Sequence, residues 1–159
     1  MKRIFLLAVL SLIAVLAYAD DVKTANAIIL SDNTVFDVSS LSSGTLKSHV
    51  KVMVFNDKGM RSELFRAYVD PFRTLTSFSG KIEAGGKTIR KLKSSDLTTV
   101  MVAEGVASDA YVTFYEPEAP YPFTVEYDYE ISYRKGFVSF PVYYPVISSD
   151  VSVTKASYS

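Results

Sequence analysis

Hydrophobic and polar residues alternate along much of the chain, most regularly between Phe123 and Tyr133. Successive side chains of a β-strand point to opposite faces, so a period of two predicts a strand with one apolar and one polar face. Leu46–Phe55 shows the same pattern, with His49 among the residues of its polar face. The apolar face of the first segment comprises Phe123, Val125, Tyr127, Tyr129, Ile131 and Tyr133.

Turn-forming residues separate these segments from further candidate strands. Gly85-Gly86 can adopt the positive φ angles of a two-residue hairpin loop. Asn56–Gly59 and Arg134–Gly136 are also expected to be hairpin turns. The strands predicted around these turns and elsewhere are Ala25–Leu30, Thr34–Val38, Ser62–Val69, Leu75–Ala84, Lys87–Leu92, Ala110–Tyr115 and Phe137–Tyr144.

Two stretches between the strands do not alternate. Glu116–Pro122 contains three prolines and is expected to be an extended connector, because proline cannot donate to a strand ladder. Ser94–Met101 is ambiguous, and Ser95 or Asp96 could cap a short helix there. The whole pattern predicts an all-β antiparallel sandwich, the alternative being a curved, partly open barrel.

The N-terminus has the three-part layout of a secretory signal peptide. Lys2 and Arg3 precede an almost wholly apolar run from Ile4 to Leu16, and Ala17-Tyr18-Ala19 is a small-x-small cleavage pattern. The run is shorter than the roughly 20 residues that a membrane-spanning helix needs, so no stable membrane span is expected. We therefore interpret residues 1–19 as a cleaved signal of an exported protein, in the periplasm or at the surface of a bacterium.

Residues 20–159 are long enough for one domain. The last segment, Val151–Ser159, alternates like a strand that has just begun, and no terminating pattern follows it. We therefore expect a single β-sandwich domain that is truncated at its C-terminal strand, as in a fragment of a longer protein.

Composition excludes several classes of function. Removing the signal takes Lys2 and Arg3 from the 17 basic residues and leaves all 17 acidic ones, so the mature chain carries a net charge of −2. That balance argues against nucleic-acid binding, which requires clustered positive charge. The chain has no cysteine, which excludes disulfides, a thiol nucleophile and a thiolate metal site.

No residue pattern indicates catalysis, and no cofactor or metal is expected. Glu126, Asp128 and Glu130 share one strand face, a spacing compatible with acid–base chemistry, but polar residues must occupy that face in any case. We expect these acids to pair with lysine or arginine on neighbouring strands. His49 is the only histidine and lacks the partners of a triad or a metal site.

Aromatic residues are unusually dense near the end of the chain. Twelve of the 21 aromatic residues lie between Tyr111 and Tyr144, and eight of those twelve are tyrosines. Most are expected to pack in the core, because strand alternation already explains their positions. Tyr121, Tyr143 and Tyr144 are the candidates for an exposed binding surface, and of the adjacent pair only one can face inward in a regular strand.

Several short segments, in their order along the chain, resemble a known domain. They are Asn56-Asp57-Lys58-Gly59-Met60, Tyr68–Phe72, Lys81–Lys87, Lys91–Leu97 and Tyr121–Glu130. Together they resemble the uncharacterised N-terminal β-domain that precedes transglutaminase-like domains in exported bacterial proteins. The resemblance covers about Thr24 to Ser159.

The resemblance implies a β-sandwich that stands ahead of a papain-like domain, whose Cys, His and Asp perform the chemistry. With no cysteine and one histidine, this chain can inherit none of those catalytic residues. We therefore expect a non-catalytic module that packs against or positions a downstream transglutaminase-like domain. The alternative is a freestanding module that binds a glycan or a peptide through exposed tyrosines.

Overall fold

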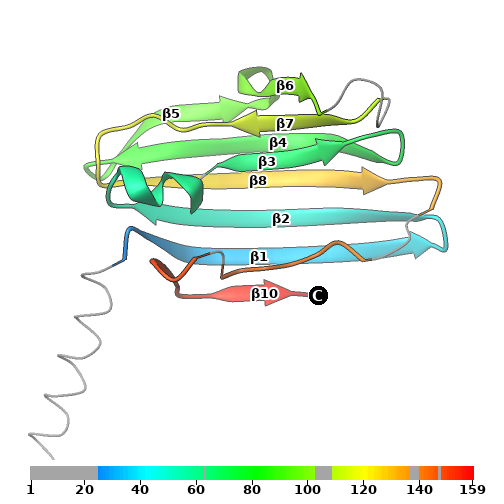
Figure 1. Ribbon diagram of the computed structural model, residues 1–159, viewed down its shortest axis with the longest axis horizontal. Helices are drawn as coiled ribbons and strands as arrows, with labels where there is room; N and C mark the ends of the chain where they lie inside the picture. Colours follow the sequence, from blue (N-terminus) through cyan, green and yellow to red (C-terminus); the bar gives the residue numbers. More distant parts are fainter. Residues whose placement is uncertain (1–24, 63, 103–108, 137–139, 147) are drawn as a thin grey trace, which may run out of the picture.

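The computed structural model describes residues 25–62, 64–102, 109–136, 140–146 and 148–159, so the expected signal at 1–19 lies outside the described residues. The described chain consists of strands, turns and two short 3-10 helices (Figure 1). In chain order the elements are β1 (Ala27–Ser40), β2 (Ser43–Val54), η1 (Asp57–Ser62), β3 (Phe65–Val69), β4 (Arg73–Ala84), β5 (Lys87–Lys93), η2 (Ser94–Asp96), β6 (Thr98–Met101), β7 (Tyr111–Tyr115), β8 (Phe123–Tyr133), β9 (Val151–Val153) and β10 (Ala156–Tyr158).

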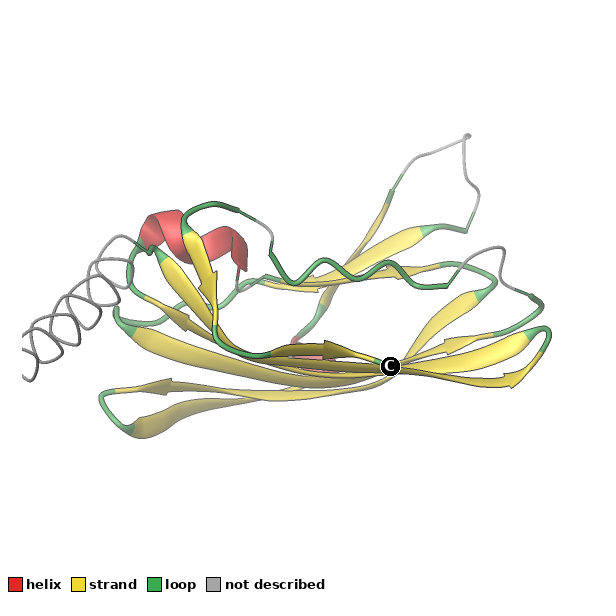
Figure 2. Ribbon diagram, turned by 90° about the horizontal axis from the view of Figure 1, so that it is seen from below, coloured by secondary structure: helices red, strands yellow, loops and turns green. Residues whose placement is uncertain are grey.

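The strands form two sheets, and the fold is all-β, as predicted. The main sheet has the order β10-β1-β2-β8-β4-β5, with β9 also paired to β1, and the small sheet has the order β3-β7-β6. Figure 2 shows the main sheet as one curved layer, with the small sheet, η1 and the extended segment 140–146 on the same side of it. The described strands do not close into a barrel, because β10 and β5 end the main sheet. The sandwich prediction is therefore confirmed.

The long strands at the centre of the main sheet follow the predicted alternation. β8 begins and ends at the predicted residues, and its side chains at Phe123, Val125, Tyr127 and Ile131 are buried. β2 and β4 flank β8 on its two sides, and both pair with it in antiparallel register. This arrangement places one face of all three strands in the core and the other face in solvent.

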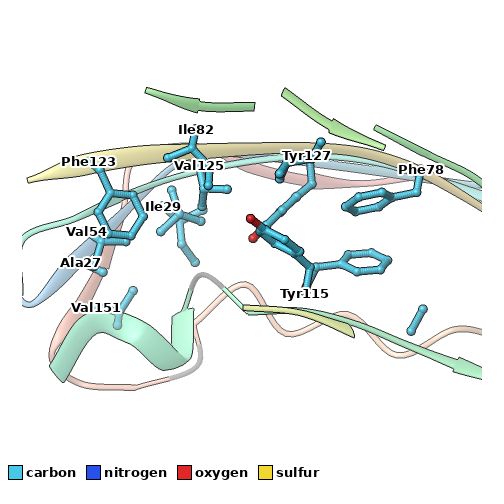
Figure 3. Close-up of a cluster of buried hydrophobic side chains, with 14 of the residues drawn as sticks. Ala27, Ile29, Val54, Phe78, Ile82, Tyr115, Phe123, Val125, Tyr127 and Val151 are labelled. Atoms are coloured by element: carbon cyan, nitrogen blue, oxygen red, sulfur yellow. The ribbon is translucent and has the colours of Figure 1, made fainter. Parts of the chain in front are cut away.

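The core lies between the concave face of the main sheet and the small sheet (Figure 3). Phe65 of the small sheet lies among aromatic rings of the main sheet, with its ring centroid 4.5 Å from that of Phe78 and 5.1 Å from that of Tyr129. Tyr127 and Tyr115 are only 3% and 7% exposed to solvent. The prediction of core packing is therefore correct for the tyrosines of β8 and for Tyr115.

The first strand and the last segment of the chain lie side by side. Val151–Val153 and Ala156–Tyr158 both pair with β1 in parallel, so the final segment is hydrogen-bonded into the main sheet. The strands predicted at Ala25–Leu30 and Thr34–Val38 are one continuous strand, β1. The ladder with β2 shifts register after Ile29, which accommodates the polar residues that interrupt the apolar pattern.

Turn chemistry is confirmed at one of the predicted hairpins. Gly85 and Gly86 have φ angles of +56° and +74°, and Ala84 pairs with Lys87 across them. Glycine adopts positive φ angles at no steric cost, so this dipeptide suits the two-residue turn that joins β4 and β5.

The hairpin predicted at Asn56–Gly59 is wrong. Asp57–Ser62 forms η1, and β3 then enters the small sheet instead of pairing with β2. The segment is therefore a crossover between the two layers. The amide nitrogen of Phe55 donates to the backbone oxygen of Asn26, which anchors the start of the crossover to the beginning of β1.

The strand predicted at Phe137–Tyr144 is also wrong for the part that the structure describes. Residues 140–144 are extended but not paired in a ladder, and 137–139 lie outside the described residues. Pro141 and Pro145 lack the amide hydrogens that a ladder requires. The ambiguous stretch after β5 consists of η2, whose Asp96 carboxylate accepts a hydrogen bond from the backbone of Lys93, followed by β6.

The connector Glu116–Pro122 contains no strand, as predicted, and leads from the small sheet into β8. Among the residues that the structure describes, no helix has the length and apolar character needed to cross a bilayer.

Candidate functional site

The three candidate tyrosines occupy two separate places. Tyr121 precedes β8, is 41% exposed and stacks on Phe123, with 5.4 Å between ring centroids. Tyr143 and Tyr144 lie in the extended segment 140–146, which contacts β1 and β10. Since the contacts of Tyr121 belong to the start of β8 and those of Tyr143 to β1 and β10, the three residues do not form one aromatic platform.

Tyr143 and Tyr144 face opposite ways, as their adjacency predicts. The Tyr143 hydroxyl donates to the backbone oxygen of Asp32 at 3.1 Å, and its ring stacks on Tyr158 at 5.2 Å between centroids. Tyr144 points outward and is 77% exposed. Tyr143 therefore anchors the segment, and of these two residues Tyr144 is the one available to a ligand.

Tyr144 belongs to a larger apolar surface, which we call the apolar stripe. Every second residue from position 140 to position 146 is a large apolar residue that is mostly exposed. Their exposed fractions are Phe140 64%, Val142 73%, Tyr144 77% and Val146 66%. With about 6.5–7 Å between alternate residues of an extended chain, the stripe is about 20 Å long.

The residues between the stripe positions hold the segment on the sheet. The backbone oxygen of Pro141 accepts a hydrogen bond from the Tyr158 hydroxyl at 3.2 Å, and Tyr143 makes the contacts described above. At one end of the stripe the Phe140 ring meets Phe36 edge-on at 6.0 Å between centroids. Prolines at 141 and 145 favour an extended backbone, so the alternation of inward and outward side chains persists without a ladder.

A polar cluster lies beneath the segment on the concave face of the main sheet. Thr34 and Ser48 are each only 6% exposed, and their hydroxyl oxygens are 2.8 Å apart. The Thr34 hydroxyl also donates to the Asp32 carboxylate at 3.1 Å. Burial raises the pKa of Asp32 above its ordinary value, and the hydroxyls of Thr34 and Tyr143 only partly oppose that shift.

The polar face of the main sheet carries charges that pair with one another. The Lys51 ammonium is 3.1 Å from the Glu126 carboxylate, and that of Lys81 is 3.5 Å from the same oxygen of Glu126. Lys81 also contacts Glu83 at 3.1 Å. The prediction that the acids of β8 pair with neighbouring strands is therefore confirmed for Glu126.

His49 lies opposite Asp128 in the ladder, with 2.8 Å between its Nδ1 atom and the carboxylate. His49, Asp128 and Glu126 each have one ligand atom within 4.8 Å of the other two, which is compatible with a metal ion. However, the two lysines already neutralise Glu126, so an ion would have to displace them. An open hollow of about 170 Å³ beside this group is lined by Ser79, Gly80, Lys81, Lys91, Glu126 and Asp128.

The sequence interpretation missed most of the stripe and the Asp32 cluster. The alternation of Phe140, Val142 and Tyr144 was visible in the sequence, but it predicted a half-buried strand. The prolines at 141 and 145 were the signal that this segment could not pair. No local signal marked Asp32, because its neighbours come from other strands.

Comparisons with known proteins support the fold alone. No protein-family model matches the chain, and no curated protein is significantly similar to it. Among solved structures, a "putative protease" from Parabacteroides distasonis matches with a TM-score of 0.55 and 16% identity, over 70% of this chain and 24% of that chain. Yeast LTA4 hydrolase in complex with bestatin gives a TM-score of 0.33 and 8% identity, over 66% of this chain and 14% of that chain, which is too low to support an argument. The chain thus spans about a quarter of the length of the Parabacteroides distasonis chain that shares its fold.

Proposed function

We propose that this chain is a non-catalytic, exported β-sandwich module that packs against or positions a second domain of a longer polypeptide. The observation that carries the proposal is the occurrence of the same fold as 24% of a longer chain. In that chain about three quarters of the polypeptide lies outside the matching region, as expected where a β-sandwich accompanies another domain.

The pairing of charges on the main sheet supports a structural role. Glu126, one of the two acids that line the hollow, contacts two lysines, which leaves its carboxylate poorly suited to act as a general base. The His49–Asp128 pair lies on the open face of a sheet, and its two side chains are 37% and 57% exposed. Active sites more often exclude water than expose their acids and bases to it.

The sequence resemblance gives the identity of the second domain in this proposal. In the family that the resemblance indicates, a transglutaminase-like domain follows the β-domain. Members of that family occur in exported bacterial proteins. The signal layout of residues 1–19 agrees with that compartment. The larger neighbour is named a "putative protease", which is compatible with a module that accompanies a papain-like domain.

The test is the genomic sequence that follows the codon for Ser159. We expect a reading frame that continues into a domain with the Cys, His and Asp of a transglutaminase-like site. A stop codon after Ser159, together with the absence of such a domain from the neighbouring genes, would overturn the proposal. Export is tested separately by N-terminal sequencing of the secreted protein, which should begin at Asp20 and not at Met1.

The exposure of Tyr144 favours one rival, a freestanding module that binds a glycan or a peptide. The rival requires the isolated mature protein to bind such a ligand. It also requires Tyr144→Ala to abolish binding, while Tyr68→Ala, which removes a tyrosine 56% exposed on the small sheet, leaves binding intact. A glycan array and calorimetry that detect no binding would eliminate this rival.

A further inference from the structure

The apolar stripe is larger than an isolated surface residue would explain. Four large apolar side chains follow one another along a segment of seven residues, and each is 64–77% exposed. No Asp, Glu, Lys, Arg or His occurs from Phe137 to Ser149 in the sequence. Contiguous exposed apolar surface of this kind marks an interaction site in a folded protein, whereas single exposed apolar residues are common.

The two outer strands of the main sheet, β5 and β10, differ in how well they are protected against the addition of another strand. β5 carries Lys87, Arg90, Lys91 and Lys93, and such cations discourage the addition of another strand. β10, Ala156–Tyr158, has no charged residue. The backbone groups of Lys155 and Ser159 bond to β1, so by alternation those of Ala156 and Tyr158 point away from the sheet. β10 is short, so Ala156 and Tyr158 together offer a partner at most two amide donors and two carbonyl acceptors.

The stripe and β10 form one continuous surface. The Tyr158 ring stacks on Tyr143, and its hydroxyl bonds to Pro141, so the segment and the outer strand are fixed to each other. Figure 1 shows the segment running along β1 next to β10. The amide nitrogen of Ser159 donates to the backbone oxygen of Thr34, which places residue 159 at the same edge.

We propose that the apolar stripe and the open edge of β10 are the docking surface for the second domain of the same polypeptide. This inference rests on the proposed function and specifies the contact that the module makes. A polypeptide joined to Ser159 would emerge beside the stripe, so its first folded domain reaches that surface at high effective concentration. The partner surface is apolar, because the stripe has no charged residue with which it could pair. It also presents a strand edge or an extended segment, which can bond to the outward backbone groups of β10.

The experiment uses the complete product of the gene, produced with its export signal. A photoreactive phenylalanine analogue replaces Tyr144 in one preparation and Tyr68 in another as the matched control. After irradiation, mass spectrometry identifies the residues joined to each probe. We expect a crosslink from position 144 to a residue beyond Ser159 of the same polypeptide, and none from position 68 to that region.

A second measurement uses the variant Val142→Ser/Tyr144→Ser/Val146→Ser and the control Tyr68→Ser/Val100→Ser. Tyr68 and Val100 are 56% and 46% exposed on the small sheet, away from the stripe. Hydrogen exchange should show the amides of Ala156 and Tyr158 losing protection by about tenfold or more in the stripe variant, the effect of losing one or more buried anchors. The amides of β2 and β8 should remain protected in both variants, which verifies that the module is still folded.

Each alternative outcome decides the inference. Crosslinks from position 144 to a second copy of the chain, or to a different protein, would overturn it. A gene product that contains a second domain but gives no crosslink at position 144 would overturn the docking surface and leave the proposed function standing. A gene product that ends at Ser159 would overturn both, because the proposed occupant would not exist.

Discussion

The hydroxyl oxygens of Thr34 on β1 and Ser48 on β2 lie 2.8 Å apart within the core, where each residue is only 6% exposed. Because the Thr34 hydroxyl donates to Asp32, Ser48 is the donor to Thr34. A buried hydroxyl that loses its partner keeps the full cost of its desolvation. The pair is therefore a sensitive point of the fold.

Replacement of Thr34 by valine should lower the free energy of unfolding by about 1–3 kcal/mol, because Ser48 and the Asp32 carboxylate both lose their hydrogen bond with the Thr34 hydroxyl. The double variant Thr34→Val/Ser48→Ala should be no less stable than the single one, since both polar groups are removed together. Urea unfolding of the two variants and of Ser48→Ala alone measures the coupling. Strictly additive losses would contradict the hydrogen bond.

Asp70 should stabilise the protein at neutral pH. Burial alone would raise the pKa of Asp70, but hydrogen bonds from the Arg73 guanidinium and from the amides of Phe72 and Arg73 outweigh it and lower that pKa below 3.8. The stabilisation is therefore present above pH 3.8 and is lost as the pH falls through the pKa of the folded state.

Asp70→Asn should accordingly cost about 1 kcal/mol at pH 7, after allowance for the partly exposed arginine. The difference from the wild type should shrink as the pH falls below 3.8. Urea unfolding across that pH range is the measurement. A difference that is constant with pH would show that the turn is lost for reasons other than charge.

Asp32 should behave in the opposite way. Burial raises the pKa of this carboxyl, so its charged form is less favourable in the folded state than in the unfolded state. Its cost to stability is absent below pH 3.8 and develops as the pH rises towards the pKa of the folded state. Asp32→Asn, which keeps the acceptor for Thr34, should be as stable as the wild type or more so at pH 7. A loss of stability at pH 7 that disappears in acid would contradict this assignment.

Gly80 on β4 has no room for a side chain. A Cβ atom there would lie 2.5 Å from the backbone oxygen of Glu126 and 3.2 Å from the Tyr127 ring. Gly80→Ala should therefore reduce the free energy of unfolding by about 1–3 kcal/mol, as overpacking does elsewhere. Gly86→Asn is the control, because position 86 is open and asparagine tolerates its positive φ. Equal losses for the two variants would contradict the close contact.

We expect the ion pairs around Glu126 to contribute little to the stability of the fold. Glu126→Gln should change the unfolding midpoint little in moderate salt, because partly exposed ion pairs contribute weakly. Zn²⁺ should leave the midpoint of the wild type unchanged, since Lys51 and Lys81 occupy the Glu126 carboxylate. A rise in the midpoint with Zn²⁺ that His49→Ala abolishes would instead identify a metal site.

Local patterns predicted the elements whose structure depends on local chemistry. The alternation from Phe123 to Tyr133 gave β8 with its buried face, and Gly85-Gly86 gave the hairpin between β4 and β5. In both cases the side-chain period or the backbone freedom of the residues themselves fixes the conformation. For the same reason the sequence could predict that only one of the adjacent residues Tyr143 and Tyr144 faces inward.

Local patterns could not predict which of the two sheets a segment joins. A turn at Asn56–Gly59 is compatible both with a hairpin and with a crossover, and only packing of Phe65 against Phe78 and Tyr129 decides between them. The raised pKa of Asp32 arises from residues distant in sequence. For the stripe, alternation predicted a strand, and the missing amide hydrogens of Pro141 and Pro145 determined the outcome.

The parallel pairing of β1 with β9 and β10 gives the module a mechanical property. A pull on residues 25 and 159 draws β1 towards its start and β10 towards its end, so the two strands are sheared past each other. In that geometry the hydrogen bonds between them, such as those from Asp32 to Lys155 and from Phe36 to Ser159, bear the load together and do not open one at a time. The edge that carries the stripe is thus also the part of the fold that would transmit force to whatever is attached beyond residue 159.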